Sequence, residues 1–410
     1  MSELTPVIIE AGGSNTEIGR AHALATPHLR ADVQRWVTST QEDFPGDDPV
    51  TTERVEEVVR AWQDLTPATL EQIGGMAQVY DLPARGLLTA VLATYLRSLD
   101  RSATDTDGCT TLALPGPRPL LMKNRDNNSW FLPMQTVLRV QPDQGHPWLA
   151  LSTAGAPGVH SSGMNAAGLC ITDTHVASRD IGPGVPRFSS MMHVLEQCAS
   201  TEEAVEYLLR VPQMGLGNLT MVDAGGRTAV VECGFSSSAV LRDVGLQDAG
   251  AAEAAGTVVA TNHFVSDHLA TSVLEPEEGT PGIDSRARRA GVIDALRHRG
   301  GDWPPSRSEV RAMAAHHVWA DGAEDPGVGR AGAAAAVGAG AADGGAVGAE
   351  PGAGSLCKHG QDSRSETVST VVFDPVGRTV DLCLGRPCAA PFFRIGFDGD
   401  PSPVQAGGDA

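Results

Sequence analysis

The run TDGCTT, residues 106–111, separates two kinds of sequence pattern. Before Gly108 the apolar residues recur at helical spacing. After it, residues 109–124 contain two short apolar runs joined by a Pro-Gly-Pro turn, which predicts a β-hairpin. A reactive Cys109 that opens a strand favours a chain that is cut before it, because the cut would give this residue both a thiol and a free amine.

The patterns predict two parts. Residues 1–108 are expected to form a mainly helical N-terminal fragment, with helices at 17–38, 51–65 and 83–99. Residues 109–410 are expected to form a catalytic fragment with helices near 188–209 and 285–298. Its short β-rich runs are 109–115, 119–124, 134–140, 147–153, 168–174, 219–223, 228–233, 367–373 and 379–384. Strands flanked by helices in this way predict an α+β fold with layered sheets.

Two segments are expected to lie outside the packed core. Residues 322–355 consist almost only of Ala and Gly with a few acidic residues, so they cannot bury enough apolar area to offset the entropy lost on ordering. We interpret them as a disordered insertion; a fraying Ala-rich helix is the alternative. Residues 399–410 are expected to form a flexible tail.

Composition argues against several classes of function. The formal net charge of −20, without a Lys/Arg cluster, opposes binding to a phosphate backbone, so nucleic acid is not an expected partner. The sequence shows neither a secretory leader pattern nor about 18 consecutive apolar residues, so we expect a soluble, cytoplasmic protein without a membrane partner. The seven cysteines form neither a CxxC pair nor an even disulfide framework, which favours reduced thiols and argues against structural zinc.

A cysteine at a chain start can act as nucleophile and base together. Its α-amine has a pKa of about 7.7 to 8, so it can accept the thiol proton at neutral pH. Before any cut, the thiol of Cys109 can attack the carbonyl of Gly108 to form a thioester that water opens, and glycine gives that backbone conformational room. The alternative is that Cys109 is a small buried apolar residue at a strand start.

Several short motifs occur in an order and spacing that resemble one protein family. They are DGCTT (107–111), NRD (124–126), ATNHF (260–264), DSRARR (284–289) and DSRSETVSTVVFD (362–374), supported by NTEIGRAHA (15–23), GMNAAGLCIT (163–172), SLCKHG (355–360) and LGRP (384–387). Together they resemble the isopenicillin N acyltransferase family. That family comprises self-cleaving acyl-CoA:6-aminopenicillanic acid acyltransferases and related amide hydrolases of the N-terminal nucleophile (Ntn) type. The resemblance extends over most of the chain outside the insertion.

The resemblance implies a four-layer αββα sandwich, made as a precursor and cut between Gly108 and Cys109, with the two products staying together. Cys109 would form the acyl-enzyme. Asp126 matches the aspartate that holds the freed amine, a role that suits a carboxylate. Asn262 matches the side chain that donates to the oxyanion. The alternatives are a solvated turn aspartate at Asp126 and a surface polar group at Asn262.

Ser363 and Arg364 match a pair near the nucleophile. There the guanidinium could hold a carboxylate such as Asp126 or keep the amine neutral. The alternative is an ordinary surface arginine before a strand. The sequence departs from the best-known family members at the Ala/Gly insertion, and its substrate-facing positions do not clearly match the penicillin-specific members.

The implied activity is hydrolysis or transfer of the acyl group of a small linear amide or thioester, such as an N-acyl amino acid or an aminoacyl amine. No cofactor and no metal are expected; acyl-CoA enters only as a candidate acyl donor. The expected partners are the small-molecule substrate and the chain's own cleaved N-terminal fragment. Two alternatives stay open: a choloylglycine-hydrolase-like acylase of bulkier N-acyl amides, and an uncleaved, non-catalytic binding protein.

Overall fold

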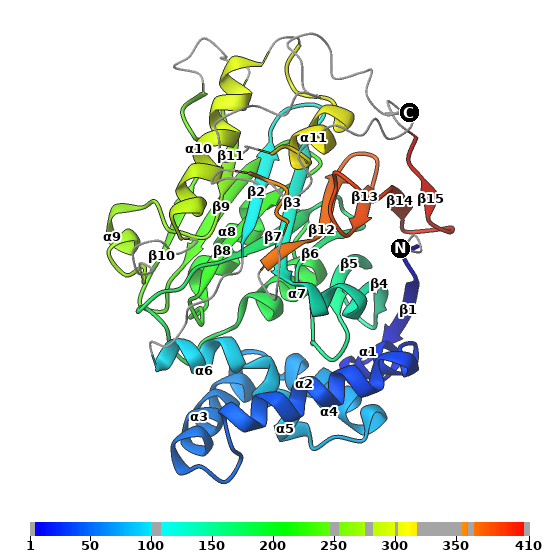
Figure 1. The fold of residues 1–410 in the computed structure, drawn as a ribbon, viewed down its shortest axis with the longest axis vertical. Helices are drawn as coiled ribbons and strands as arrows, with labels where there is room; N and C mark the ends of the chain where they lie inside the picture. The colour runs from blue at the N-terminus through cyan, green and yellow to red at the C-terminus, as the bar shows by residue number, and fades with distance from the viewer. Residues whose placement is uncertain are drawn as a thin grey trace.

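A computed structural model describes residues 5–100, 108–246, 254–274, 282–299, 302–317, 355–359 and 365–405. Two sheets pack face to face between helices (Figure 1). Sheet 1 contains, in spatial order, β1 (Ile8–Gly13), β4 (Gln135–Pro142), β5 (Trp148–Thr153), β6 (Ser162–Asn165), β7 (Cys170–His175), β8 (Gly217–Val222), β9 (Thr228–Cys233) and β10 (Ser238–Leu241). Sheet 2 contains β11 (Val258–Ala260), β2 (Cys109–Leu114), β3 (Leu120–Asn128), β12 (Ser365–Asp374), β13 (Thr379–Leu384), β14 (Phe392–Gly396) and β15 (Ser402–Pro403).

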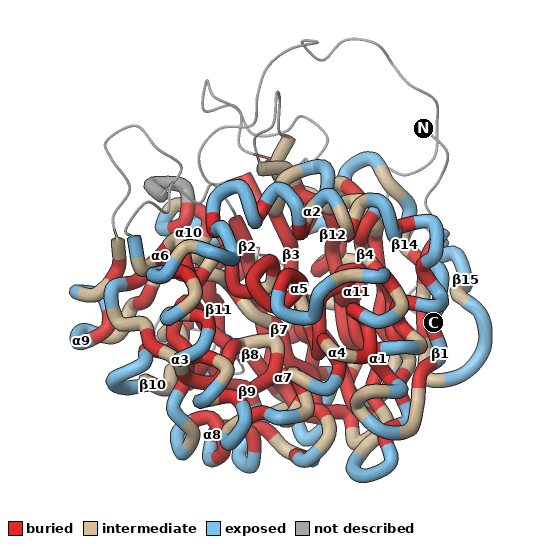
Figure 2. Tube along the Cα trace, turned by 90° about the horizontal axis from the view of Figure 1, so that it is seen from below, coloured by how far each residue is buried: buried red, intermediate tan, exposed pale blue. Residues whose placement is uncertain are grey.

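Helices cover the outer faces of both sheets. On sheet 1 they are α1 (Asn15–Leu24), α7 (Arg187–Gln197) and α8 (Thr201–Arg210), whose apolar side chains share a core with that sheet. On sheet 2 they are α10 (Gly282–His298) and α11 (Arg307–Ala314). A third core joins residues of sheet 1 to residues of sheet 2. These layers confirm the expected αββα arrangement, and Figure 2 shows the buried strands at its centre.

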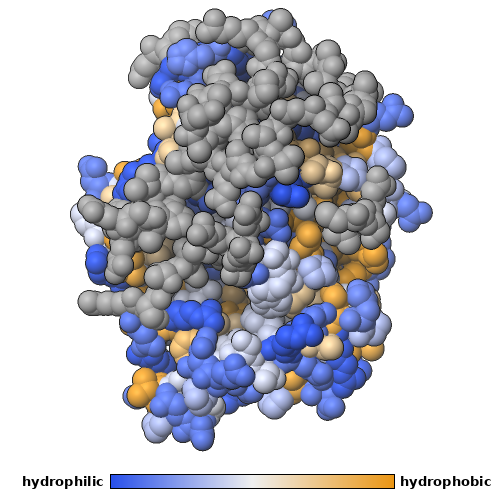
Figure 3. Space-filling model, viewed as in Figure 1, coloured by the Kyte–Doolittle hydropathy of each residue, from blue (hydrophilic) through white to orange (hydrophobic). Residues whose placement is uncertain are grey.

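A separate group of helices closes one end of the sandwich (Figure 1). It comprises α2 (Arg30–Asp43), α3 (Pro49–Leu65), α4 (Pro67–Tyr80), α5 (Ala84–Val91) and α6 (Ala93–Leu99). Its core includes Trp62, whose indole N–H donates to the carbonyl of Gly184, 3.0 Å away. The short helix α9 (Asp267–Ala270) lies outside this group. On the described part of the face in Figure 3, polar residues are interspersed with smaller apolar areas.

The two-residue period of strands sorts the side chains of β2 and β3. Leu112 and Leu114 pack beneath the helices on sheet 2, whereas Ala113 and Leu121 face sheet 1. The same alternation carries Cys109 to the side that faces sheet 1. Cys109 therefore lies at the end of the space between the two sheets, where polar side chains follow the apolar residues of the core.

Several expected elements have different limits. The helix expected at 17–38 is interrupted near Pro27, because proline lacks the N–H that would continue the helical ladder. The helix expected at 188–209 is two helices; Ser200 caps the second by accepting from the Glu203 N–H. The helix α4 and the strands β1, β6, β10, β11, β14 and β15 were not expected.

The two segments expected to lie outside the packed core are only partly described by the structure. Residues 322–354, the body of the expected insertion, lie outside the described residues. Within the expected flexible tail, Ser402 pairs with Arg394 and Pro403 with Phe393, while residues 406–410 lie outside the described part. Among the described residues, no helix combines the length and apolar character needed to cross a membrane.

Candidate active site

Cys109 is the first residue of β2 and is buried, with 8% of its surface exposed. It pairs with Arg125 across the β2–β3 hairpin. One residue earlier, the carbonyl of Gly108 accepts a hydrogen bond from the backbone N–H of Asp126 at 2.6 Å. The hairpin ladder therefore extends across the Gly108–Cys109 peptide bond and fixes its orientation.

The main chain of Cys109 is held by two polar side chains from other segments. Its N–H donates to Oδ1 of Asn262 at 2.8 Å, and its carbonyl accepts from Nη1 of Arg288 at 2.6 Å. Arg288 also donates to Oδ1 of Asn262 and to Oγ1 of Thr110, both at 2.7 Å. Nδ2 of Asn262 donates to the carbonyl of His175 at 2.9 Å. These contacts join β2, β7 and α10 at the proposed nucleophile.

Asp126 lies in β3 on the other side of Gly108. Its Oδ1 accepts from the hydroxyl of Thr367 at 2.6 Å, and the carboxylate is almost fully buried. A Cβ placed on Gly108 would lie 2.6 Å from Oδ2 of Asp126 and 2.8 Å from Nζ of Lys358. Since Cβ atoms essentially never approach heavy atoms that closely, position 108 admits only glycine without displacing Asp126 or Lys358.

Three charged side chains form a network on the cavity side of β3, in which Lys123 is buried and Asp173 and Arg187 are partly exposed. Nζ of Lys123 donates to Oδ1 of Asp173 at 2.6 Å and to the carbonyl of Ser161 at 3.1 Å. Nε of Arg187 donates to Oδ2 of Asp173 at 3.0 Å, and its Nη1 donates to the carbonyl of Leu216. Burial alone would raise the pKa of Asp173, but Lys123 and Arg187 outweigh it and hold the pKa well below its usual range. Asp173 is therefore ionised throughout the neutral range.

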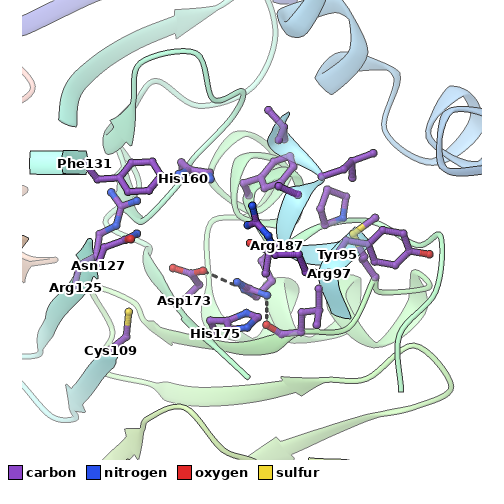
Figure 4. Close-up of a pocket in the computed structure, with 18 of the residues that line it drawn as sticks. Tyr95, Arg97, Cys109, Arg125, Asn127, Phe131, His160, Asp173, His175 and Arg187 are labelled. Atoms are coloured by element: carbon purple, nitrogen blue, oxygen red, sulfur yellow. Dashed lines mark hydrogen bonds and ion pairs between the residues drawn. The ribbon is translucent and has the colours of Figure 1, made fainter. Parts of the chain in front are cut away.

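A cavity of about 380 Å³ opens beside Cys109 (Figure 4). Its charged lining contains four cationic side chains and two carboxylates, which are Arg97, Lys123, Arg125, Arg187, Asp126 and Asp173. Its lining also includes aromatic side chains from the helical end, the η2 turn (Ser129–Met134) and α7, which are Trp36, Tyr95, Phe131 and Phe188. The cavity combines apolar walls with an excess of positive charge near the thiol.

Burial is the largest influence on the pKa values of Cys109 and His160. It raises the pKa of the Cys109 thiol; Lys123 lowers that pKa, Asp173 and Asp126 raise it, and Arg125 lowers it. Burial also lowers the pKa of His160 to about 3, so this imidazole is neutral at pH 7. A neutral thiol needs a base to become a thiolate. Within the uncut chain, the backbone amide of Cys109 cannot be that base.

The structure brings together Cys109, Gly108, Asp126 and Asn262, four of the residues singled out from the sequence. Asn262 presents its oxygen to the Cys109 N–H. Donation to an oxyanion, the role expected from the sequence, would have to come from Nδ2; this group has two N–H bonds, and among the described residues it donates one to His175. Ser363 and Arg364 lie outside the described residues.

Sequence reasoning missed several residues at the site. Arg288 lies within the quoted DSRARR motif, and its spacing on a helix gave no sign that it reaches the main chain of Cys109. Lys123 directly precedes the NRD motif, yet its partner Asp173 comes from β7, and Asp173 also binds Arg187 of α7. Alternation along β3 was the available signal, since it directs Lys123 and Arg125 to one face of the sheet.

The comparisons with known proteins bear on the same region. Residues 114–299 match the model of a family described as acyl-coenzyme A:6-aminopenicillanic acid acyl-transferase. The matched segment begins at the last residue of β2, Leu114, and contains Asp126, Asn262 and Arg288. Cys109 lies just before it.

Similar solved structures include two variants of conjugated bile acid hydrolase from Clostridium perfringens. One has a TM-score of 0.45 and 15% identity, covering 73% of this chain and 98% of that chain. The other has a TM-score of 0.43 and 14% identity, covering 72% and 96%. Penicillin V acylase from Agrobacterium tumefaciens has a TM-score of 0.34 and 14% identity, covering 70% and 86%. No curated protein matches the chain.

Proposed function

We propose that this protein is a self-cleaving cysteine enzyme of the Ntn type, which carries the acyl group of a small amide or thioester on Cys109. The observation that carries the proposal is the position of Cys109. It opens a buried strand at the edge of a cavity, with its N–H on Asn262, its carbonyl on Arg288 and the preceding carbonyl on the Asp126 N–H.

Self-cleavage would begin with attack of the Cys109 thiol on the Gly108 carbonyl carbon. The Asp126 N–H, 2.6 Å from the Gly108 oxygen, supports this step because it can stabilise negative charge that develops there. The C–N bond to Cys109 breaks, the leaving nitrogen takes the proton that the thiol gives up, and a thioester links Gly108 to the sulfur. Water then opens the thioester and leaves a carboxylate on Gly108 and a free thiol and amine on Cys109.

In the cut enzyme the new amine would be the base that the thiol lacks in the uncut chain. The amine takes the thiol proton, and the thiolate attacks the substrate carbonyl. The proton goes to the leaving amine or thiol as that bond breaks, and the acyl group remains on sulfur as a thioester. Water or an acceptor amine then takes the acyl group. Asn262 would orient the amine through Oδ1 and offer its second N–H to the oxyanion.

The cavity lining favours an acyl compound that also carries a negative group. Lys123 and Arg187 share the single carboxylate of Asp173, so these three side chains together keep one positive charge. Arg125 lines the same space, whereas Arg97 is paired with Asp43 at 3.0 Å. Phe131 and Tyr95 offer apolar surface for an acyl chain or ring. N-acyl amino acids combine both features. The volume of about 380 Å³ suits a small substrate.

The decisive experiment is intact-mass analysis and N-terminal sequencing of the purified full-length protein. We expect two co-purifying fragments, the larger beginning Cys-Thr-Thr, and we expect Cys109→Ala to remain uncut and inactive. Cys198→Ala is the matched control, because Cys198 is a buried cysteine beneath α8 and belongs to a different core. An active, uncut Cys109→Ala protein would contradict the proposal.

A substrate panel tests the reaction of the mature enzyme. We expect a mass increase equal to the acyl group on the larger fragment when an N-acyl amino acid or an acyl thioester is mixed with it and quenched in acid. Turnover restricted to bulky N-acyl amides would favour the choloylglycine-hydrolase-like alternative. Absence of both cleavage and adduct would favour a non-catalytic binding protein.

A further inference from the structure

Four side chains of metal-binding type meet on the outer side of sheet 2. They are His317 after α11, Cys357 and His359 in the segment Ser355–His359, and Cys388 between β13 and β14. One ligand atom from each lies within 4.8 Å of all the others. Nε2 of His317 is 3.1 Å from Nε2 of His359, which is 3.2 Å from Sγ of Cys388, and the two sulfurs are 3.5 Å apart.

These separations are close to the edges of a metal-centred tetrahedron. Zinc bonds of about 2.0 to 2.3 Å place neighbouring nitrogen and sulfur ligands about 3.3 to 3.8 Å apart. Two sulfurs and two imidazoles form a ligand set that leaves no open position, as in structural zinc sites. Hard ions such as Mg²⁺ and Ca²⁺ prefer oxygen ligands, and none of these four groups supplies one.

Zinc binds cysteine in its thiolate form, and the positive charge of the ion stabilises both sulfur ligands.

We infer that His317, Cys357, His359 and Cys388 bind one zinc ion, which fixes the segment Ser355–His359 against sheet 2. Cysteine spacing did not reveal this set, because its members come from three separate segments and Cys357-Lys358-His359 contains only one cysteine. This inference departs from the expectation, drawn from the cysteine spacing, that the protein has no structural zinc. The inference does not depend on the function proposed above.

The segment between the ligands reaches the proposed active site. The backbone of Lys358 exchanges two hydrogen bonds with Thr367: its N–H donates to Oγ1 at 2.8 Å, and its carbonyl accepts from the Thr367 N–H at 3.1 Å. Thr367 in turn donates to Asp126 at 2.6 Å, and Nζ of Lys358 lies beside Gly108. Zinc would thus position Lys358 and Thr367, which are positioning residues for Asp126.

The other side of the segment is tied to α11 and β3. The N–H groups of Leu356 and Cys357 donate to the carbonyl of His316 at 3.1 and 3.2 Å. Nδ2 of Asn124 donates to the carbonyls of Leu356 and Ala314 at 2.7 and 2.8 Å. Leu356 is also buried in the core beneath α10 and α11. A metal ion bound by Cys357 and His359 would therefore fix a segment that already packs against β3.

Zinc content gives the first test. The full-length protein is purified without a metal-affinity step, saturated with zinc, dialysed and measured by inductively coupled plasma mass spectrometry. We expect about one ion per chain in the wild type and in the Cys198→Ala control, and loss of at least about nine-tenths of it in Cys357→Ala and Cys388→Ala. Cys388→His should retain zinc because it restores a fourth ligand.

Two measurements on the wild type keep the test independent of how the variants fold. Cobalt should produce the visible absorption of a tetrahedral site with thiolate ligands, and zinc should displace it. On removal of the metal, hydrogen exchange should rise in residues 355–359 and at Thr367, but not in β5. Wild type that retains no zinc, equal zinc in the cysteine variants, or a Cys357–Cys388 disulfide in protein isolated anaerobically would overturn the inference.

Discussion

The strand β3 has two halves that are equally buried and chemically opposite. Leu120, Leu121 and Met122 fill cores on both faces of sheet 2. The next four residues, Lys123–Asp126, are polar or charged and no more than 5% exposed. The apolar half needs only neighbours of suitable shape, whereas every group of the polar half needs a partner.

The partners of the polar half come from widely separated segments. Lys123 donates a hydrogen bond to Asp173 of β7, and Arg125 donates one to Thr153 of β5. Asn124 donates to the carbonyls of Ala314 in α11 and Leu356 in the segment Ser355–His359. Asp126 accepts from Thr367 of β12. The apolar half therefore contributes mainly to the stability of the sandwich. The polar half gathers five parts of the chain at one point, which is what a reaction centre requires.

The largest effect is expected from Asp173→Asn, which leaves the Lys123 ammonium without its carboxylate. Breaking a buried ion pair in this way costs about 3 to 5 kcal/mol of unfolding free energy. The pKa of Asp173 is depressed in the fold, so its contribution is present above its unfolded pKa of about 4 and is lost as the pH falls below it. Urea unfolding from pH 3 to 8 should show a difference between wild type and variant that shrinks on acidification.

Asp47→Asn is the control for that change, because Asp47 is an exposed aspartate outside the site. Adding Lys123→Met to Asp173→Asn should recover part of the lost stability, since no unpaired ammonium then remains on Lys123. An Asp173→Asn protein as stable as the control at pH 8 would show that the polar half does not depend on this partner.

Leu121→Ala tests the apolar half of the same strand. Leu121 is fully buried between the sheets, so truncation should cost about 2 to 5 kcal/mol of unfolding free energy. Self-cleavage should persist in the folded variant at low temperature, because Leu121 holds no polar group of the site. Val376→Ala, at a side chain 58% exposed, should change stability by no more than about 0.5 kcal/mol. A folded Leu121→Ala protein that does not cleave itself would show that the apolar half of β3 also contributes to the reaction, which would contradict the distinction drawn between the two halves.

Asp126→Asn should change the reaction more than the fold. Asparagine keeps the shape and an oxygen acceptor for Thr367 but cannot balance an ammonium on Cys109. We expect self-cleavage and acyl transfer to slow by about 100-fold, the scale of losing one electrostatic stabiliser, with a melting temperature close to that of wild type. Gel densitometry over time gives the rate. A normal rate would exclude Asp126 from the mechanism.

The smallest effect is expected at Glu196, a partly buried carboxyl that contacts the neutral indole of Trp148. Burial raises the pKa of Glu196 to about 7, and the hydrogen bond from the indole of Trp148 offsets part of that rise. Because the folded pKa exceeds the unfolded one, wild type loses stability as the pH rises from about 4.5 to about 7. Glu196→Gln should therefore gain stability over wild type at pH 8 and none at pH 4. The gain should be less than the roughly 3 kcal/mol that the full change in pKa would give, because the side chain is partly exposed to solvent.

The exposed residue Glu206 gives the matched control, and Glu206→Gln should not reproduce this pH dependence. If Glu196→Gln showed the same gain at pH 4 and pH 8, the effect would come from packing instead of titration.

Local sequence patterns were sufficient for the hairpin at the centre of the site. Alternation and a Pro-Gly-Pro turn predicted β2 and β3 within a few residues, and the motif resemblance identified Cys109, Asp126 and Asn262, which the structure brings together. Most strands of sheet 1 were also predicted. Each of these inferences depends on residues close together in the sequence, where periodicity and turn chemistry carry information.

Contacts between distant segments were not predictable in this way. The strand β1 is only six residues long and finds its parallel partner β4 more than a hundred residues later, so no local pattern indicates the pair. Arg288, Asp173 and the four residues of the metal-binding type likewise acquire their roles through the fold. A single sequence gives the type of each side chain but not the neighbour that satisfies it.

The parallel pairing of β1 with β4 has a consequence for how the protein is assembled. The strand lies before Gly108 in the sequence and pairs along six residues with a strand that lies after it. Cleavage of the chain after Gly108 would therefore leave one sheet shared by two polypeptides. The two polypeptides would be made in equal amounts, because a single precursor contains both. Pieces 1–108 and 109–410, produced from separate genes in one cell, offer a natural split reporter whose reassembly would restore the edge of the sheet.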